Sequence, residues 1–232
     1  MNEEELRLSD EAVRWVKLHH KDLIDKFADA AEYSADARPT TLFMAGSPGA
    51  GKTEISKRFI SGFKQKPIRI DADEIRTMCP GYTGKNAHVF QKAATKGVHI
   101  LYDYALAKNL NVILDGTFAY QNAIGNIQRS LEHERKVEIF FVYQDPFQAW
   151  DFTKKREAIE HRRVSKQAFI DSFFKSQMNV NHAKITFGSK IELNLIIKDF
   201  EKDLEQLELN VENVDTYIKK AYSREHLEQH LL

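Results

Sequence analysis

The chain has 232 residues, of which 42% are hydrophobic and 29% are charged, a balance typical of a globular protein with a buried core. Its 34 Lys and Arg residues equal its 34 Asp and Glu residues, so net charge gives no overall attraction to nucleic acid or to an anionic membrane. The single cysteine, Cys79, excludes an intramolecular disulfide and a cysteine-rich metal site. The N-terminus is acidic and lacks the apolar centre of a signal peptide, and no segment is apolar enough to span a membrane, so we expect a cytoplasmic protein.

Amphipathic patterns divide the chain into a main domain with two extensions. Residues 10–33 carry a broken apolar stripe at helical spacing, and Pro39 closes the linker that follows. We therefore expect an N-terminal helical extension over 1–38, a main α/β domain over 39–200, and a polar, helical C-terminal tail over 201–232.

Short apolar segments in the main domain predict five strands. They are 40–46, 67–70, 111–114, 137–143 and 191–197. Helical patterns separate the strands, and the longest of them runs from about residue 86 to residue 108. This alternation predicts an α/β fold with a five-stranded, mainly parallel sheet and helices on both faces. Ligands of such sheets bind beyond the carboxyl ends of the strands, so the residues that follow each strand are the first candidates for a site.

The first predicted strand ends in a phosphate-binding loop. Its sequence fits the pattern G-x-x-x-x-G-K-[ST] at every fixed position, with the residues Gly46, Ser47, Pro48, Gly49, Ala50, Gly51, Lys52 and Thr53. The glycines allow backbone N–H groups to surround phosphate oxygens, Lys52 is expected to reach the β- and γ-phosphates, and the Thr53 hydroxyl is expected to bind Mg²⁺. The helix that follows points the positive end of its dipole at the same phosphates. The sequence therefore predicts a P-loop NTPase that binds ATP with Mg²⁺.

Other nucleotide-hydrolase motifs do not accompany this loop. The chain lacks the N-K-x-D motif by which G-proteins read the base, and Asp115 is followed by Gly116 rather than by the second acid of an oligomeric ATPase. Small-molecule kinases are the class that remains.

Acidic residues follow the second and third predicted strands. Transfer of a phosphoryl group to a hydroxyl needs a carboxylate that orients and deprotonates the acceptor. Asp71 and Asp73 are two residues apart at a strand end, so both can face the γ-phosphate, although either could instead cap the next helix. Asp115, followed by Gly116 and Thr117, occupies the position of a Walker B acid and could hold Mg²⁺ or bind the acceptor.

Basic residues follow the fourth predicted strand. Arg156, Arg162 and Arg163 lie in the segment KKREAIEHRRVSKQ. A mobile cationic lid over the phosphates is one interpretation, because cations must neutralise the charge of the transferring group. An ordinary solvated helix face is the alternative.

Four of these segments together resemble the zeta-toxin family of P-loop kinases, often described as UDP-N-acetylglucosamine kinases. They are MAGSPGAGKT, RIDADEIR, NVILDGT and TKKREAIEHRRVSKQAF, within roughly 40–197. The resemblance implies a P-loop kinase domain of the nucleotide-kinase type over 39–200, with ATP and Mg²⁺ as cofactors. It also implies a nucleotide sugar as acceptor and a small helical antitoxin as a partner that blocks the nucleotide site.

The resemblance also implies roles for single residues. Asp73 stands where the family has its catalytic base, Asp115 and Thr117 stand at its acceptor site, and Arg156 and Arg162 match its two lid arginines, with Arg163 as the alternate. The family carries an acid on the long helix that binds the sugar nucleotide. This chain has His99 there, with Asp103 one helical turn later.

Two further functions stay open from the sequence. One is a kinase for another hydroxyl, such as that of a nucleoside, an antibiotic or a polynucleotide 5′-end, although the neutral net charge makes nucleic acid a poor fit. The other is a nucleotide-gated binding module without turnover, against which Asp73, Asp115 and the arginines argue, because a switch needs no base.

Overall fold

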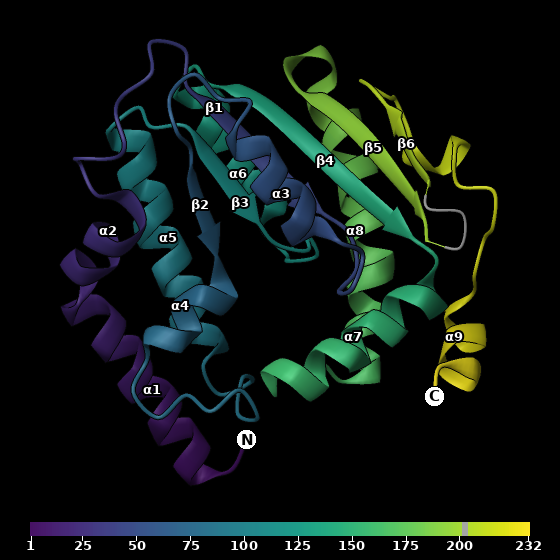
Figure 1. Cartoon of the computed structure of the whole chain (residues 1–232), viewed down its shortest axis with the longest axis horizontal. Coiled ribbons are helices and arrows are strands. Elements are labelled where there is room, and N and C mark those ends of the chain that lie inside the picture. Colours follow the sequence, from purple (N-terminus) through teal and green to yellow (C-terminus); the bar gives the residue numbers. More distant parts are fainter. Residues whose placement is uncertain (201–203) are drawn as a thin grey trace.

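The computed structural model describes residues 1–200 and 204–232, and its strands lie in a single sheet (Figure 1). The strands are β1 (Thr40–Ala45), β2 (Ile68–Asp71), β3 (Val112–Asp115), β4 (Lys136–Gln144), β5 (Glu192–Asp199) and β6 (Leu204–Glu208). Their order across the sheet is β2-β3-β1-β4-β5-β6. The first five pair in parallel, whereas β6 runs antiparallel to β5. The predicted α/β fold with a mainly parallel sheet is confirmed.

The sixth strand corrects the expectations of five strands and of a helical tail. Leu207 of β6 lies opposite Ile196 of β5, so the tail extends the sheet. A charged segment can form an edge strand because β5 satisfies its backbone while its side chains stay in water, and the charges discourage further strand addition. Helical turns in the described part of the tail are limited to η2 (Val214–Thr216) and α9 (Arg224–His230). Residues 201–203 of the expected tail lie outside the described residues.

Helices cover both faces of the sheet (Figure 1). The helices before the tail are α1 (Glu3–Leu18), α2 (His20–Ala28), α3 (Lys52–Ile60), α4 (Ala72–Met78), α5 (Gln91–Ala107), α6 (Ala123–Glu132), α7 (Pro146–Glu160) and α8 (Lys166–Phe187), with the short turn η1 (Gly188–Lys190). The N-terminal extension is two helices broken at His19, and both pack on α5. The long helix α5 begins five residues later than about residue 86, at Gln91, after a series of turns.

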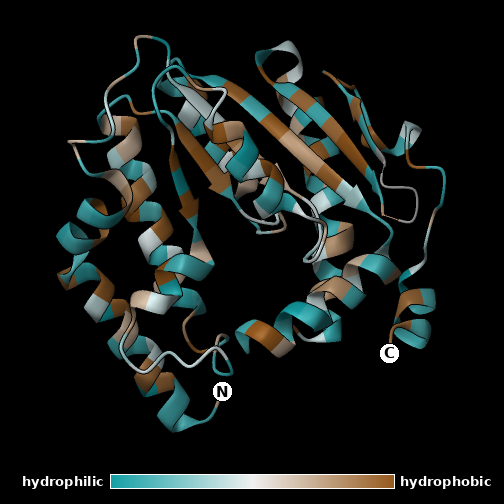
Figure 2. Cartoon of the chain, viewed as in Figure 1, coloured by the Kyte–Doolittle hydropathy of each residue, from teal (hydrophilic) through white to brown (hydrophobic). Residues whose placement is uncertain are grey.

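Alternation along β1 separates two layers of core. Leu42 and Met44 point to one face, where they pack with Ile55 of α3. Phe43 and Ala45 point to the other face, where the larger core includes residues of α5, α6 and α8. Side chains of successive strand residues project to opposite faces, so a continuous apolar run such as 42–45 needs helices on both. Figure 2 shows the resulting pattern, with hydrophobic strands at the centre and hydrophilic outer helix faces.

The parallel order brings five carboxyl ends of strands to one edge of the sheet. β1 lies between β3 and β4, so the loop after β1 has the ends of β2 and β3 on one side and the ends of β4 and β5 on the other. This arrangement positions the site. None of the helices in the described part of the chain is long and apolar enough to cross a membrane.

Candidate active site

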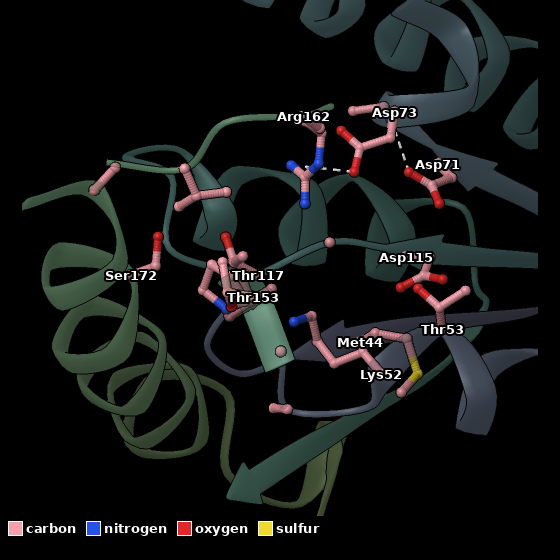
Figure 3. A pocket seen from close by; sticks show the side chains of 18 of the residues that line it. Met44, Lys52, Thr53, Asp71, Asp73, Asp115, Thr117, Thr153, Arg162 and Ser172 are labelled. Carbon is pink, nitrogen blue, oxygen red and sulfur yellow. Dashed lines mark hydrogen bonds and ion pairs between the residues drawn. The ribbon is translucent and has the colours of Figure 1, made fainter. Parts of the chain in front are cut away.

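A cleft of about 1220 Å³ opens at this edge of the sheet. Its walls are the phosphate loop, the turn from β2 into α4, the end of β3, one side of α5, the side of α7 and the segment 160–165. Figure 3 shows Lys52, Asp73, Asp115 and Arg162 converging on this space from four different parts of the chain. Residues that are far apart in the sequence therefore line the same cleft.

Backbone geometry makes the phosphate loop. Gly46, Gly49 and Gly51 have φ values of 131°, 73° and 87°, a region that side chains rarely adopt. A Cβ on Gly46 would lie 2.3 Å from the Val142 carbonyl oxygen, and one on Gly49 would lie 2.0 Å from that of Ala149. The loop therefore packs directly against β4 and α7, and only glycine fits at these two positions.

Lys52, the first residue of α3, lies inside the loop. Its Nζ donates a hydrogen bond to the Ser47 carbonyl oxygen at 2.7 Å. Burial lowers the pKa of Lys52 to about 8; Asp115 opposes this shift, and the positive charges of Arg162 and Arg156 add to it. An anion bound in the loop would favour the charged amine, because it would replace the hydration that burial removes.

The two acids after β2 have different environments. Asp71 is the N-cap of α4, where its side chain accepts a hydrogen bond from the backbone N–H of Asp73 at 2.8 Å. Its side chain is 11% exposed, whereas that of Asp73 is 25% exposed. Asp71 therefore caps the helix. Both acids line the cleft, and Asp73 is the more exposed of the two.

Two arginines hold Asp73 from opposite sides. Arg76, one turn along α4, donates to its Oδ1, and Arg162 Nη1 lies 3.2 Å from its Oδ2. Figure 3 shows the second contact, which joins the segment after α7 to α4 across the cleft. The Nε atoms of both arginines are buried without a hydrogen-bond partner. Unpaired buried donors are costly, so the arrangement of the two arginines around Asp73 leaves hydrogen-bonding capacity unused.

Arg69 of β2 ties the acids together and was not among the residues singled out from the sequence. Its Nη2 lies 2.6 Å from Oδ2 of both Asp71 and Asp115, and its Nη1 bonds to Glu74. The register that pairs Asp71 with Asp115 in adjacent parallel strands creates this contact. The strand pattern I-R-I-D is the signal that could have found it, since an arginine inside an apolar strand needs buried acids.

The neighbouring charges of Asp71, Asp73, Asp115 and Arg69 shift the pKa values within this group of residues. Burial raises the pKa of Asp71 to about 6, with the charges of Asp73 and Asp115 adding to the effect. Asp115 is 2% exposed, and its Oδ2 accepts from Ser56 Oγ at 2.7 Å as well as from Arg69. Although burial opposes it, the charges of Asp115 and Asp71 raise the pKa of Arg69, so the arginine keeps its charge.

The other arginines lie on the α7 side of the cleft. Arg156 Nε donates to Glu160 Oε2 at 2.7 Å along one face of α7, and the Arg156 side chain is 39% exposed. The helix ends at His161, whose φ of 58° turns the chain so that Arg162 reaches Asp73. Arg163 also lines the cleft.

The cleft is lined by one of the two residues expected from the long helix. His99 and Thr117 line the cleft. Asp103 does not, which corrects its assignment: its carboxylate is 60% exposed and pairs with Arg129 of α6. One helical turn along α5 moves a side chain by 5.4 Å, enough to leave the cleft. Tyr120, which was not expected, lines it instead, and its hydroxyl accepts from Asn126 Nδ2 at 3.1 Å.

Comparison with known families gives one match. The model of the family described as zeta toxin matches residues 24–204, which include the phosphate loop, the acids after β2 and β3, and the arginines of the α7 segment. None of the curated proteins matches the chain.

Solved structures share the fold. One from work on the PezAT chromosomal toxin–antitoxin system of Streptococcus pneumoniae has a TM-score of 0.60 and 13% identity, over 100% of this chain and 88% of that chain. The AvrRxo1-ORF1:AvrRxo1-ORF2 structure with sulphate ions has a TM-score of 0.59 and 15% identity, over 92% and 71%. The Pnkp1/Rnl/Hen1 RNA repair complex has a TM-score of 0.50 and 15% identity, over 77% and 50%. At such identities the likeness is one of fold alone.

Proposed function

Because the chain belongs to the zeta toxin family, whose members are P-loop kinases that use ATP, we propose that it transfers the γ-phosphate of ATP to a hydroxyl of a nucleotide sugar, UDP-N-acetylglucosamine or a relative. The observation that carries the proposal is the contact between Arg162 and Asp73 in the cleft that Lys52 also lines. It joins a phosphate-binding loop, a carboxylate and a cation in one space, and these are the three parts that phosphoryl transfer to a hydroxyl requires.

The proposed reaction consists of one phosphoryl transfer and one proton transfer. The acceptor hydroxyl oxygen forms a bond to the γ-phosphorus while the bond from that phosphorus to the β–γ bridging oxygen breaks, leaving ADP. Asp73 takes the hydroxyl proton, which its ionised carboxylate can accept. Lys52, Arg156 and Arg162 neutralise the charge on the transferring group. Asp73 accepts from Arg76 on Oδ1 and contacts Arg162 through Oδ2, which leaves lone pairs on both oxygens for the acceptor hydroxyl.

Thr53 and Asp115 are the residues that would hold Mg²⁺. Hydroxyl and carboxylate oxygens are the ligands that this ion prefers, and when bound it would draw charge from the β- and γ-phosphates. Asp115 Oδ2 accepts from Ser56 and Arg69, so its other oxygen is the one suited to the ion or to its water. Among the described residues no group of three or more His, Cys, Asp or Glu side chains could hold a metal, which fits an ion held mainly by phosphates and water.

A transfer assay tests the proposal. The chain is incubated with ATP labelled at the γ-phosphate and, separately, with several uridine-diphosphate sugars, a nucleoside and an oligonucleotide. We expect label on at least one uridine-diphosphate sugar. Label only on the nucleoside or the oligonucleotide would contradict the nucleotide-sugar acceptor but would support kinase activity. Absence of label on every acceptor, with ATP bound, would favour the nucleotide-gated binding module.

We also propose a helical antitoxin as partner. The support is the membership of the zeta toxin family and the likeness to a structure from the PezAT toxin–antitoxin system. The test mixes the chain with the product of the gene adjacent to its own and measures binding of a fluorescent ATP analogue. A complex that binds the analogue much more weakly than the free chain is expected. A complex with unchanged affinity, or failure to form one, would contradict the proposal.

A further inference from the structure

Two aromatic rings line the cleft on the side away from the acids. Phe152 projects from α7, and Phe200 follows the end of β5. Their ring centroids are 4.6 Å apart and their planes make an angle of 61°. Phe200 is 57% exposed, so the pair is not part of the apolar core. More than half of the Phe200 surface is therefore open to a ligand in the cleft.

The elements that carry the two rings touch the phosphate loop. The loop meets α7 at Gly49, where a Cβ would lie 2.0 Å from the Ala149 carbonyl oxygen. It meets β5 at Gly51, where a Cβ would lie 2.7 Å from Lys198 Nζ. The loop therefore adjoins both of the elements that carry the rings, through Ala149 of α7 and Lys198 of β5.

The sheet order decides which part of a nucleotide reaches them. Asp73 and Asp115 follow β2 and β3, on one side of β1, whereas the rings follow β4 and β5, on the other side (Figure 1). If the γ-phosphate faces Asp73, the triphosphate lies across the loop, and the nucleoside must leave on the side of β4 and β5. The part of the donor that arrives there is the nucleobase.

We propose that Phe152 and Phe200 form the subsite for the nucleobase of the donor nucleotide, which stacks on the exposed ring of Phe200. The inference rests on the proposed kinase function and adds to it the residues that bind the base. Stacking on a ring is tolerant of base identity, because every base has a π-face. The subsite therefore takes nucleoside triphosphates with limited preference for the base, and it should bind ATP and GTP alike.

One lysine lines the cleft beside the rings. Lys198 Nζ is 6.0 Å from the Phe200 ring centroid, and its side chain is 9% exposed. It pairs with Glu54 at 3.1 Å and with Glu205 at 3.5 Å. A cation beside Phe200 and Gly51 can attract the anionic α-phosphate, and it can also interact with the π-face of a stacked base.

The experiment compares a ligand that has a base with one that lacks it. Affinities for ATP, GTP and inorganic tripolyphosphate are measured by calorimetry for the wild-type chain, Phe200→Leu, Phe152→Leu and Phe200→Trp. Leucine keeps apolar bulk without a ring, and tryptophan keeps a ring. Ile159→Ala is the matched control, since Ile159 is an apolar residue of α7 that is 80% exposed and is not one of the residues lining the cleft.

We expect the Kd for ATP and for GTP to rise about tenfold in both leucine variants, within the range of one stacked base. The Kd for tripolyphosphate should not change, and Phe200→Trp and Ile159→Ala should bind ATP as the wild type does. Unchanged ATP affinity in both leucine variants would overturn the inference and leave the kinase proposal standing, as would an equal loss for ATP and tripolyphosphate. A wild-type chain that binds neither ligand would overturn the kinase proposal and the inference with it.

Discussion

The donor half and the acceptor half of the cleft are built in different ways. The donor half comes from eight consecutive residues whose shape depends on backbone contacts, such as the approach of Gly46 to Val142. The acceptor half comes from side chains of α4, α5, the end of β3 and the segment after α7, held by ion pairs such as Arg162 with Asp73. Backbone shape tolerates few substitutions, whereas paired side chains can be exchanged singly. We therefore expect the donor half to tolerate little variation and the acceptor half to determine what is phosphorylated.

The largest effect should come from the one side chain of the donor half that meets phosphate. Lys52→Ala removes the cation from the loop, and transfer should fall by more than about 10³-fold. Among the described residues, the hydrogen bond that Lys52 donates goes to the Ser47 carbonyl oxygen of its own loop, so the thermal unfolding midpoint should change little. The measurement is label transfer from ATP beside a thermal melt, with Lys64→Ala, an exposed lysine outside the cleft, as the control. Normal turnover by folded Lys52→Ala would refute the kinase proposal.

The next effect separates the two acids after β2. Asp73→Asn should lower kcat by about 10³-fold while ATP still binds, because an amide cannot take the acceptor's proton. Asp71→Asn should chiefly lower the free energy of unfolding, because an asparagine still caps α4 but cannot pair with Arg69. Measuring kcat, ATP affinity and denaturant unfolding for both variants checks this division. An inactive but stable Asp71→Asn beside a fully active Asp73→Asn would reverse the assignment.

The sequence predicts the donor half well because its motif is local. A glycine loop between a strand and a helix needs no knowledge of distant residues, and the Lys52 position follows from it. The five parallel strands can also be predicted from the sequence, since each is a short apolar segment with turn residues at its ends.

The acceptor half and the sheet edge depend on contacts that no single segment reveals. Arg69 meets Asp115 only because the register of β2 and β3 sets them side by side. Asp103 lies outside the cleft because it is one helical turn beyond His99 along α5, where it pairs with Arg129 of α6. The sequence of β6 is that of a polar tail and has no apolar strand pattern. The segment is a strand because its backbone pairs with β5.

Two neighbouring arginines allow a finer test of the acceptor half. Arg162→Ala should lower kcat by about 10²- to 10³-fold with a smaller effect on ATP affinity, because its charge matters most while the phosphoryl group transfers. Arg156→Ala should act in the same direction. Arg163→Ala is the matched control and should lose less, because Arg162, rather than Arg163, contacts Asp73. An unchanged kcat in both the Arg162 and the Arg156 variants would favour the alternative that this segment is an ordinary solvated helix face.

The smallest effect concerns the choice of acceptor. His99 lines the cleft at the position where the family has an acid, and a neutral imidazole can both donate and accept whereas a carboxylate only accepts. An unpaired buried polar group costs about 1–3 kcal/mol, which is roughly five- to 150-fold in relative rate. His99→Glu should therefore change the ratio of kcat/KM between UDP-N-acetylglucosamine and a second uridine-diphosphate sugar by about tenfold. Asp103→Asn is the control on the same helix, and it should leave the ratio unchanged because Asp103 pairs with Arg129 outside the cleft. If His99→Glu left the ratio unchanged while Asp103→Asn altered it, the acceptor would bind one helical turn further along α5, beside Asp103 rather than His99.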